Sequence, residues 1–222
     1  RALLGLPANY HVLFLQGGAT QQFSMLPMTL LAGQSRPADY LHTGYWSGKA
    51  LPEARRVGPV RVAWSGESCA FRRLPSDAEL DFQPDAPYLH YVSNETVEGL
   101  QFHRILGRED VPRVCDMSSD FLSAPGDYAR FAMIYAHAQK NIGPAGVTVV
   151  VLRDELLNGA PRTLPGFLDY RAQIDAHSIL NTPPVFAIYV VHLVLKWLKK
   201  NGGLAAMAEK NLEEAAAEDP PY

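Results

Sequence analysis

A lysine at position 140 has neighbours that suit a chemical role better than a purely solubilising one. The stretch Ile134–Gly146 places apolar or small residues on both sides of the charge, and a β-branched run, Val147–Val151, follows it. An amine attacks a carbonyl only when deprotonated, and burial or a cationic neighbour lowers a lysine pKa from its usual ~10.4. The residues alone leave a second interpretation open, in which the stem of Lys140 packs at a loop tip and its amine stays in water.

A candidate anion site lies near the start of the chain. The apolar run Tyr10–Leu15 predicts a strand, Gln16–Thr20 with its two glycines predicts a turn, and Gln21–Ala32 predicts an amphipathic helix. A strand, a glycine turn and a helix together aim free backbone N–H groups and a positive dipole end at an anion. A Gly-Gly turn is weak by itself, so the pattern needs support from elsewhere in the chain.

A carboxylate ends a further predicted buried strand, Val111–Asp116. An acid in this place can simply cap a strand end, or it can hold a ring nitrogen in its protonated form by opposite charge and hydrogen bonding. Asp116 precedes Lys140 by 24 residues. One intervening helix-sized element could therefore return both residues to neighbouring strand ends.

Two more residues have types that suit a flat ligand bearing oxygen atoms. Trp46 offers an indole for offset stacking, worth ~0.5–1.5 kcal/mol beyond buried area, although core packing is the alternative. Thr96 follows a predicted strand end and offers a short hydroxyl, although it could instead cap the next turn. Lys49 is the nearest competing lysine, but it opens the helical-looking segment Ala50–Arg56 and is expected to be a solvated helix-end residue.

Five blocks along the chain resemble the phosphoserine aminotransferase family and occur in the family's order. The resemblance implies a pyridoxal-phosphate-dependent class-V aminotransferase. It also implies an α/β fold, the fold-type I large domain, with a mainly parallel, seven-stranded sheet flanked by helices. The blocks are Phe14–Met28, Asp39–Ala50, Leu89–Thr96, Asp116–Ser119 and Tyr135–Gly146.

The resemblance also implies a role for each candidate residue. Lys140 would hold pyridoxal 5'-phosphate as an imine and then act as general base and acid. Asp116 would face the ring nitrogen, Trp46 would stack on the ring, and Thr96 would donate to the phenolate oxygen. The rest of the implied set comprises Ala19 and Thr20 at the cofactor phosphate, Gln139 beside the lysine, and Asn181 and Thr182, which in a homodimer would reach the partner's cofactor phosphate.

The implied reaction transfers an amino group from L-glutamate to 3-phosphohydroxypyruvate, giving phosphoserine and 2-oxoglutarate. It belongs to serine synthesis and also to pyridoxine synthesis, and two half-reactions at one site predict ping-pong kinetics. The family's basic residues that grip substrate lie partly before Arg1 and partly in a small domain beyond Tyr222. Some relatives also carry arginine at the position of Thr20. We therefore expect a fragment whose cofactor half is complete and whose substrate half is not.

Two other functions stay open at this point. One is a cofactor-binding fragment without turnover. The other is a related pyridoxal-phosphate lyase or desulfurase, which usually needs a reactive cysteine. Cys69 and Cys115 have no activating neighbours in sequence, so we interpret both as reduced thiols of a cytoplasmic protein.

The C-terminal part predicts a long helix, Val185–Lys200, followed by Gly202-Gly203. Its apolar residues lie all round the helix, so we expect it to be largely buried. Asn181 and Thr182 are expected to cap it and form a second anion site at its N-terminus. We expect a cofactor-binding large domain over residues 1–203 and a helical tail over residues 204–222 that leads toward the small domain.

Composition agrees with an ordinary globular chain. Of the 222 residues, 47% are hydrophobic and 19% are charged, which permits a sizeable core. The net charge is −3 and there is no block of like charges, so the charge pattern indicates neither a nucleic-acid nor a membrane-surface partner. No secretory signal is recognised, and Val185–Leu195, the longest apolar run, is too short to span a bilayer. No histidine pair has metal-ligand spacing.

Overall fold

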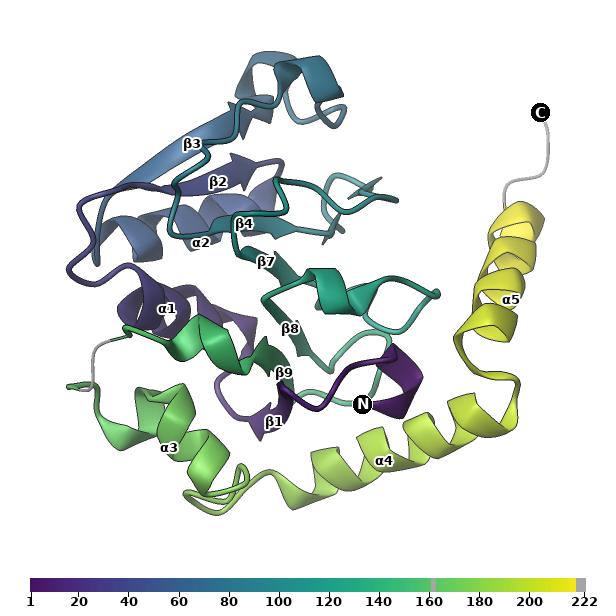
Figure 1. Ribbon diagram of the computed structural model, residues 1–222. Helices are drawn as coiled ribbons and strands as arrows, with labels where there is room; N and C mark the ends of the chain where they lie inside the picture. Colours follow the sequence, from purple (N-terminus) through teal and green to yellow (C-terminus); the bar gives the residue numbers. More distant parts are fainter. Residues whose placement is uncertain (161–162, 219–222) are drawn as a thin grey trace.

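A seven-stranded sheet with the strand order β1-β9-β8-β7-β4-β2-β3 forms the centre of the computed structural model, which describes residues 1–160 and 163–218 (Figure 1). Strands β8, β7, β4, β2 and β3 are mutually parallel, and β9 runs antiparallel to β1 and β8. The expected mainly parallel α/β sheet is therefore confirmed. The strands of the sheet are β1 (Tyr10–Leu15), β2 (Ala38–His42), β3 (Val60–Ser65), β4 (Leu89–Val92), β7 (Arg113–Asp116), β8 (Met133–His137) and β9 (Thr148–Arg153).

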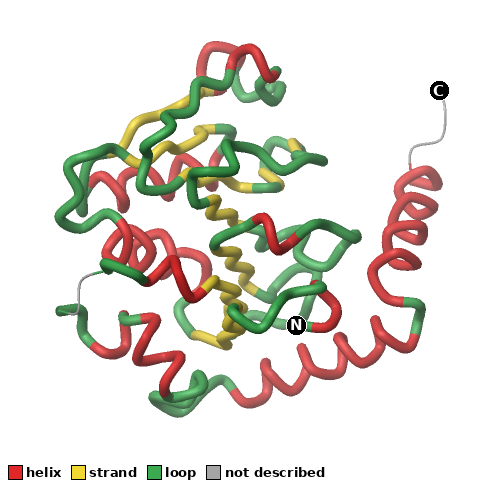
Figure 2. Tube along the Cα trace, viewed as in Figure 1, coloured by secondary structure: helices red, strands yellow, loops and turns green. Residues whose placement is uncertain are grey.

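Helices surround this sheet, and Figure 2 shows them in red around the yellow strands. A two-stranded hairpin lies outside the main sheet and consists of β5 (Asn94–Glu95) and β6 (Leu100–Gln101). The α-helices are α1 (Gly18–Leu30), α2 (Tyr45–Arg55), α3 (Tyr170–Asp175), α4 (Val185–Lys200) and α5 (Gly203–Glu218). Short 3-10 helices are η1 (Ala2–Leu4), η2 (Gly66–Cys69), η3 (Asp77–Glu79), η4 (Tyr128–Arg130), η5 (Asp154–Leu157) and η6 (Gly166–Leu168).

Two apolar clusters hold the layers together, one on each face of the sheet. On one face, Phe23 and Leu26 of α1 pack with Leu51 of α2 against strand residues such as Tyr135. On the other face, long loops and η1 cover the sheet together with the inner side of α4, which contributes Val191. The central strands are buried almost throughout, as expected for strands that have layers on both faces.

The strand register brings several chain segments to one edge of the sheet. His137 at the end of β8 lies opposite Thr148, and Thr148 lies opposite Leu15 at the end of β1. On the other side of β8, the end of β7 at Asp116 lies opposite Val92, the last residue of β4. The connections after β1, β2, β4, β7 and β8 therefore leave from the same edge, where open α/β sheets bind their ligands.

Helix α4 differs from the sequence-based expectation, because only one side of it is buried. Ala187, Val191 and Leu198 are buried, and several large apolar residues on the remaining surface are exposed. An apolar composition all round a helix cannot indicate which side meets the core. The exposed apolar residues are Val185, Phe186, Tyr189, Leu193 and Trp197.

The expected cap of α4 is also wrong. Pro184 is the N-cap and no side chain caps the helix, so Asn181 and Thr182 lie in the preceding loop rather than at the helix N-terminus. Lys49 does not open a helix either, since it lies inside α2 and is exposed there.

Residues 117–132 contain no α-helix, only turns and η4, yet β7 and β8 are neighbours. The helix-sized element considered between Asp116 and Lys140 is therefore unnecessary. The helical tail is observed as α5, which extends away from the sheet (Figure 1), while the last residues of the expected tail, 219–222, lie outside the described residues.

Candidate active site

Lys140 lies in the turn that follows β8, and its amine has two partners from other segments. The Nζ atom donates a hydrogen bond to Thr96 Oγ1 at 2.6 Å and lies 5.9 Å from the centroid of the Trp46 ring. Lys140 and Thr96 are exposed, and Trp46 is half-buried. The structure thus brings together three predicted site residues that follow three different strands, and it places the lysine amine at the surface.

Asp116 ends β7, next to the strand that leads to Lys140, and is only 3% exposed. Burial raises the pKa of its carboxyl to about 7, and the nearby acids Asp120 and Glu95 act in the same direction. The hydroxyl and the backbone N–H of Ser118 donate to Oδ1 at 2.5 and 2.8 Å, which opposes part of this rise in pKa. A cation bound against Asp116 would favour its ionised form.

Ser118 also connects Asp116 to the end of β8. The backbone N–H of His137 donates to Ser118 Oγ at 3.1 Å, and His137 Nδ1 lies 3.0 Å from Thr148 Oγ1. The carboxylate is therefore held through one hydroxyl to the strand from which the Lys140 turn begins. Desolvation lowers the pKa of His137, which favours its neutral form.

The glycine turn after β1 lies at the same edge. Gly17 and Gly18 have φ angles of 86° and 70°, a region that favours glycine, and Gly17 is the N-cap of α1 without a capping side chain. A Cβ atom on Gly18 would lie 3.9 Å from His137 Nδ1, so the turn passes beside the end of β8. Ala19 is half-buried and Thr20 is exposed in the first turn of α1. The N-terminus of α1 thus provides the arrangement that binds anions.

The other predicted residues lie nearby and are exposed. Gln139 is exposed in the turn directly before Lys140. Asn181 and Thr182 are exposed, and the carbonyl oxygen of Thr182 accepts a hydrogen bond from Gln16 Nε2 at 2.7 Å. Their loop therefore contacts the segment between β1 and the glycine turn, and their role toward a partner subunit stays a prediction.

Two residues with clear structural roles at the site were not predicted from sequence. Ser118 follows Asp116 by two residues, and this spacing is a known signal, because an aspartate side chain often bonds the N–H two residues on. Glu95 is fully buried beside Trp46. Nothing local in the sequence indicated this, because acids are seldom fully buried.

The buried thiol of the chain lacks the surroundings of a nucleophile. Cys115 is fully buried, and burial raises its pKa well above the ordinary value, with Asp120 and Asp116 adding to the effect. Cys69 is half-buried, and both cysteines are free. Within residues 1–160 and 163–218 there is also no group of three or more His, Cys, Asp or Glu that could hold a metal ion. None of the described helices is long and apolar enough to cross a membrane.

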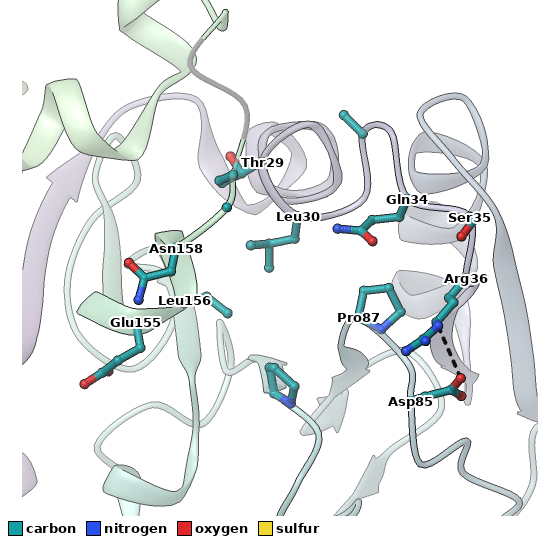
Figure 3. A pocket seen from close by; sticks show the side chains of 14 residues that line it. Thr29, Leu30, Gln34, Ser35, Arg36, Asp85, Pro87, Glu155, Leu156 and Asn158 are labelled. Atoms are coloured by element: carbon teal, nitrogen blue, oxygen red, sulfur yellow. Dashed lines mark ion pairs between the residues drawn. The ribbon is translucent and has the colours of Figure 1, made fainter.

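A cavity of about 540 Å³ lies at the opposite edge of the sheet, where β2, β4 and β7 begin (Figure 3). Its lining includes Arg36, which pairs with Asp85, together with Pro87 and Pro112 at the amino ends of β4 and β7. The predicted residues are therefore remote from this cavity along the strands. They gather at the carboxyl edge instead.

Comparison with known proteins finds relatives that match nearly the whole chain. Phosphoserine aminotransferase from Laribacter hongkongensis is 53% identical over 218 residues, which cover 97% of this chain and 59% of that protein. The solved phosphoserine aminotransferase from Bacillus circulans subsp. alkalophilus superposes with a TM-score of 0.92 at 46% identity, covering 97% of this chain and 59% of the other. The chain thus spans about three-fifths of the length of such relatives.

A third relative was solved with its cofactor. Phosphoserine aminotransferase from Trichomonas vaginalis, described as bound to PLP, superposes with a TM-score of 0.89 at 37% identity, covering 97% of this chain and 64% of the other. These superpositions confirm the fold-type I architecture. The model of the family "Aminotransferase class-V" matches residues 1–218, and this chain therefore belongs to the class-V aminotransferases.

Proposed function

We propose that this chain forms the pyridoxal 5'-phosphate site of a phosphoserine aminotransferase. The whole protein would transfer the amino group of L-glutamate to 3-phosphohydroxypyruvate in serine synthesis, and it would also serve pyridoxine synthesis. The observation that carries the proposal is the position of the Lys140 amine, which bonds Thr96 and lies over Trp46 beside the strand that ends in Asp116.

The residues present fit the chemical groups of this cofactor. An uncapped helix N-terminus at Gly17 suits a phosphate, and an indole suits a flat ring. Asp116 is a buried acid, and such a group is ionised at low cost only beside a positive charge, which a protonated ring nitrogen provides. The names of the relatives and the cofactor in the Trichomonas vaginalis structure support the same assignment.

Each side chain has a defined task in this proposal. The bound cofactor supplies an aldehyde carbon and an electron-withdrawing ring. Lys140 binds the aldehyde through Nζ and, once the substrate amine has displaced it, holds and returns the proton as general base and acid. Asp116 keeps the ring nitrogen protonated, and Trp46 orients the ring. Thr96 Oγ1 accepts from Lys140, so its own hydroxyl hydrogen remains able to donate to the phenolate oxygen.

We also propose a homodimer in which Asn181 and Thr182 contact the partner's cofactor phosphate, while Ala19 and Thr20 bind the phosphate of their own site and Gln139 binds the cofactor beside Lys140. Support comes from the exposure of Asn181 and Thr182, which leaves both side chains accessible to a second subunit. Residues 1–203 would form the cofactor-binding domain and residues 204–222 would lead out of it. The two free thiols support a cytoplasmic location.

Two alternatives differ in how the structure bears on them. A cofactor-binding fragment without turnover is distinguished from the proposed enzyme by its response to glutamate, as described below. A lyase or desulfurase that uses Cys115 is disfavoured, because burial keeps this thiol protonated and therefore a poor nucleophile.

Absorption spectra with added pyridoxal phosphate test the proposal. The unsubstituted chain and Lys49→Ala, which removes an exposed lysine from α2, should both develop the near-visible band of a lysine-bound cofactor. Lys140→Ala should not, and borohydride reduction followed by mass spectrometry should place the cofactor on residue 140. A band retained by Lys140→Ala would contradict the assignment. Glutamate should bleach the band, and a band that resists glutamate would support the fragment without turnover.

A further inference from the structure

Glu95 is a fully buried acid in the short hairpin that follows β4. It immediately precedes Thr96, the residue that accepts the hydrogen bond of the Lys140 amine. A buried carboxylate is costly unless its oxygens are bonded, so its contacts indicate what it does.

The carboxylate of Glu95 bonds the N-terminus of α2. Its Oε2 accepts the backbone N–H of Trp46 at 2.9 Å, and its Oε1 accepts the N–H of Ser47 at 2.9 Å and the Thr43 hydroxyl at 3.2 Å. Helix N-termini carry unpaired N–H groups and a positive dipole end, so an anionic acceptor there is favourable. Glycine occupies the N-cap of α2, so the carboxylate from the hairpin supplies the oxygens that a capping side chain would provide.

The hairpin approaches this turn closely. A Cβ atom on Gly44 would lie 2.9 Å from Glu95 Cδ and 2.4 Å from Glu98 Oε2. Glu98 accepts the Tyr45 N–H at 2.9 Å from the same hairpin, although it is less buried than Glu95. Two acids thus bond successive N–H groups of one helix end, but only one of these groups belongs to the tryptophan over Lys140.

We propose that Glu95 is a positioning residue whose carboxylate fixes the indole of Trp46 relative to the Lys140 amine. Glu95 bonds the backbone of the tryptophan, and the adjacent Thr96 bonds the lysine. Two adjacent residues of one segment therefore fix the positions of both Trp46 and the Lys140 amine. The consequence for cofactor stacking rests on the function proposed above, whereas the placement of the indole can be measured without cofactor.

Tryptophan fluorescence of the cofactor-free chain tests the placement. The chain has three tryptophans, so Trp64→Phe with Trp197→Phe leaves Trp46 as the reporter. Glu95→Gln keeps the size of the side chain but loses its charge and turns an amide donor toward N–H groups. We expect a red-shifted emission and stronger acrylamide quenching of Trp46. Glu98→Gln, the matched control, should leave both unchanged.

A second reporter separates repositioning from general loosening. With Trp46→Phe and Trp197→Phe, the remaining Trp64 of β3 should not respond to Glu95→Gln. Gly44→Ala provides a second variant that retains both acids and displaces them by the close contacts above, and it should shift Trp46 in the same direction. An unchanged Trp46 signal in Glu95→Gln and Gly44→Ala, or an equal response in Glu98→Gln or at Trp64, would overturn the proposal.

Pyridoxal phosphate titration measures the consequence for binding. Glu95→Gln should weaken binding by up to about tenfold, which equals the ~1.4 kcal/mol at the upper end of an aromatic stacking contribution. Glu98→Gln should bind as the unsubstituted chain does. If the Trp46 signal shifts while the unsubstituted chain fails to bind the cofactor, the proposed function fails and the positioning role stands. Unchanged binding in Glu95→Gln would contradict the claim that Glu95 strengthens cofactor binding by orienting Trp46 for stacking.

Discussion

Asp116 and Lys140 follow neighbouring strands of one sheet, yet their surroundings are opposite. Asp116 is buried, bonded twice by Ser118 and connected through that hydroxyl to the backbone of β8. Lys140 lies three residues beyond β8 in an exposed turn, where Thr96 and Trp46 hold its amine. The acid is thus part of the packed sheet edge, whereas the amine is presented from it.

This difference suits the tasks proposed for the two groups. A carboxylate that holds a ring nitrogen protonated needs a fixed position and a low dielectric, both of which burial provides. An amine that forms and breaks bonds to successive partners needs room to move, which an exposed turn provides. Substitutions should therefore separate the two residues, with chemistry affected most at Lys140 and stability affected most at Asp116.

Lys140→Ala should have the largest effect, and it should fall almost entirely on chemistry. The glutamate half-reaction, followed as formation of 2-oxoglutarate in the presence of pyridoxal phosphate, should slow by ~10²–10⁴-fold or more, because general acid–base transfer is lost together with covalent attachment. The free energy of unfolding should change by no more than ~0.5 kcal/mol, as at other exposed positions. Lys49→Ala should leave the rate unchanged. A large loss of stability in Lys140→Ala would place the lysine among the structural residues instead.

Asp116→Asn should have its main effect on the pH dependence of stability. Burial raises the pKa of Asp116 to about 7, whereas an unfolded aspartate has ~3.9. The folded chain therefore binds more protons between these values, and Asp116 lowers the free energy of unfolding as the pH rises from about 4 to about 7, by up to ~4 kcal/mol. The asparagine variant cannot ionise, so it should match the unsubstituted chain at pH 4 and exceed its stability at pH 8.

Urea titrations of the cofactor-free chain at several pH values measure this slope. Glu213→Gln, which changes an exposed acid of α5, should leave the slope in place. Saturation with pyridoxal phosphate should reduce the slope in the unsubstituted chain, because the protonated ring nitrogen favours the ionised carboxylate. An identical slope in Asp116→Asn would show that the acid does not hold its proton in the folded chain.

Much of the fold could be predicted from the sequence, because its signals are local. The β-branched and aromatic runs at Tyr10–Leu15 and Thr148–Arg153 are strands because they are buried between two layers. Helix α4 shows the limit of such signals. Its length and its end follow from local residues. Which of its faces is exposed depends on the surfaces that lie beside it, and composition cannot predict this.

The site residues also fall into two groups, those that the sequence predicts and those that only the structure reveals. Asp116, Lys140, Trp46 and Thr96 belong to recognisable blocks, and strand register brings those blocks to one edge. Glu95 could not be found from its neighbours, because its partners at positions 43, 46 and 47 become close only when the hairpin packs on α2. The long-range contacts that orient the site residues are therefore the part that required the structure.

Ser118→Ala should have an intermediate effect on the free energy of unfolding, because it removes a hydrogen bond to Asp116 but leaves the acid itself in place. Loss of the hydroxyl leaves Asp116 without one donor and His137 N–H without its acceptor, which should cost about 1–3 kcal/mol of unfolding free energy. The pKa of Asp116 should rise further, because a bond to its charged form is lost. Ser119→Ala, which removes a hydroxyl bonded to the Asn94 carbonyl, should leave the pH dependence of unfolding unchanged. If Ser118→Ala and Ser119→Ala shifted the pH dependence of the unfolding free energy equally, the hydrogen bond from Ser118 would not be what sets the pKa of Asp116.

Thr96→Val should have the smallest effect on the folded chain, because its bond to Lys140 lies in water. Solvent replaces a lost partner at an exposed site, so the free energy of unfolding should change by less than ~0.5 kcal/mol, well below the change in Ser118→Ala. Binding of pyridoxal phosphate should weaken by about fivefold, equal to ~1 kcal/mol for one hydrogen bond. Thr96→Ser retains the hydroxyl and should bind the cofactor normally. If Thr96→Val instead destabilises the chain as strongly as Ser118→Ala, the amine side of the site is as firmly packed as the acid side, and the contrast between them is lost.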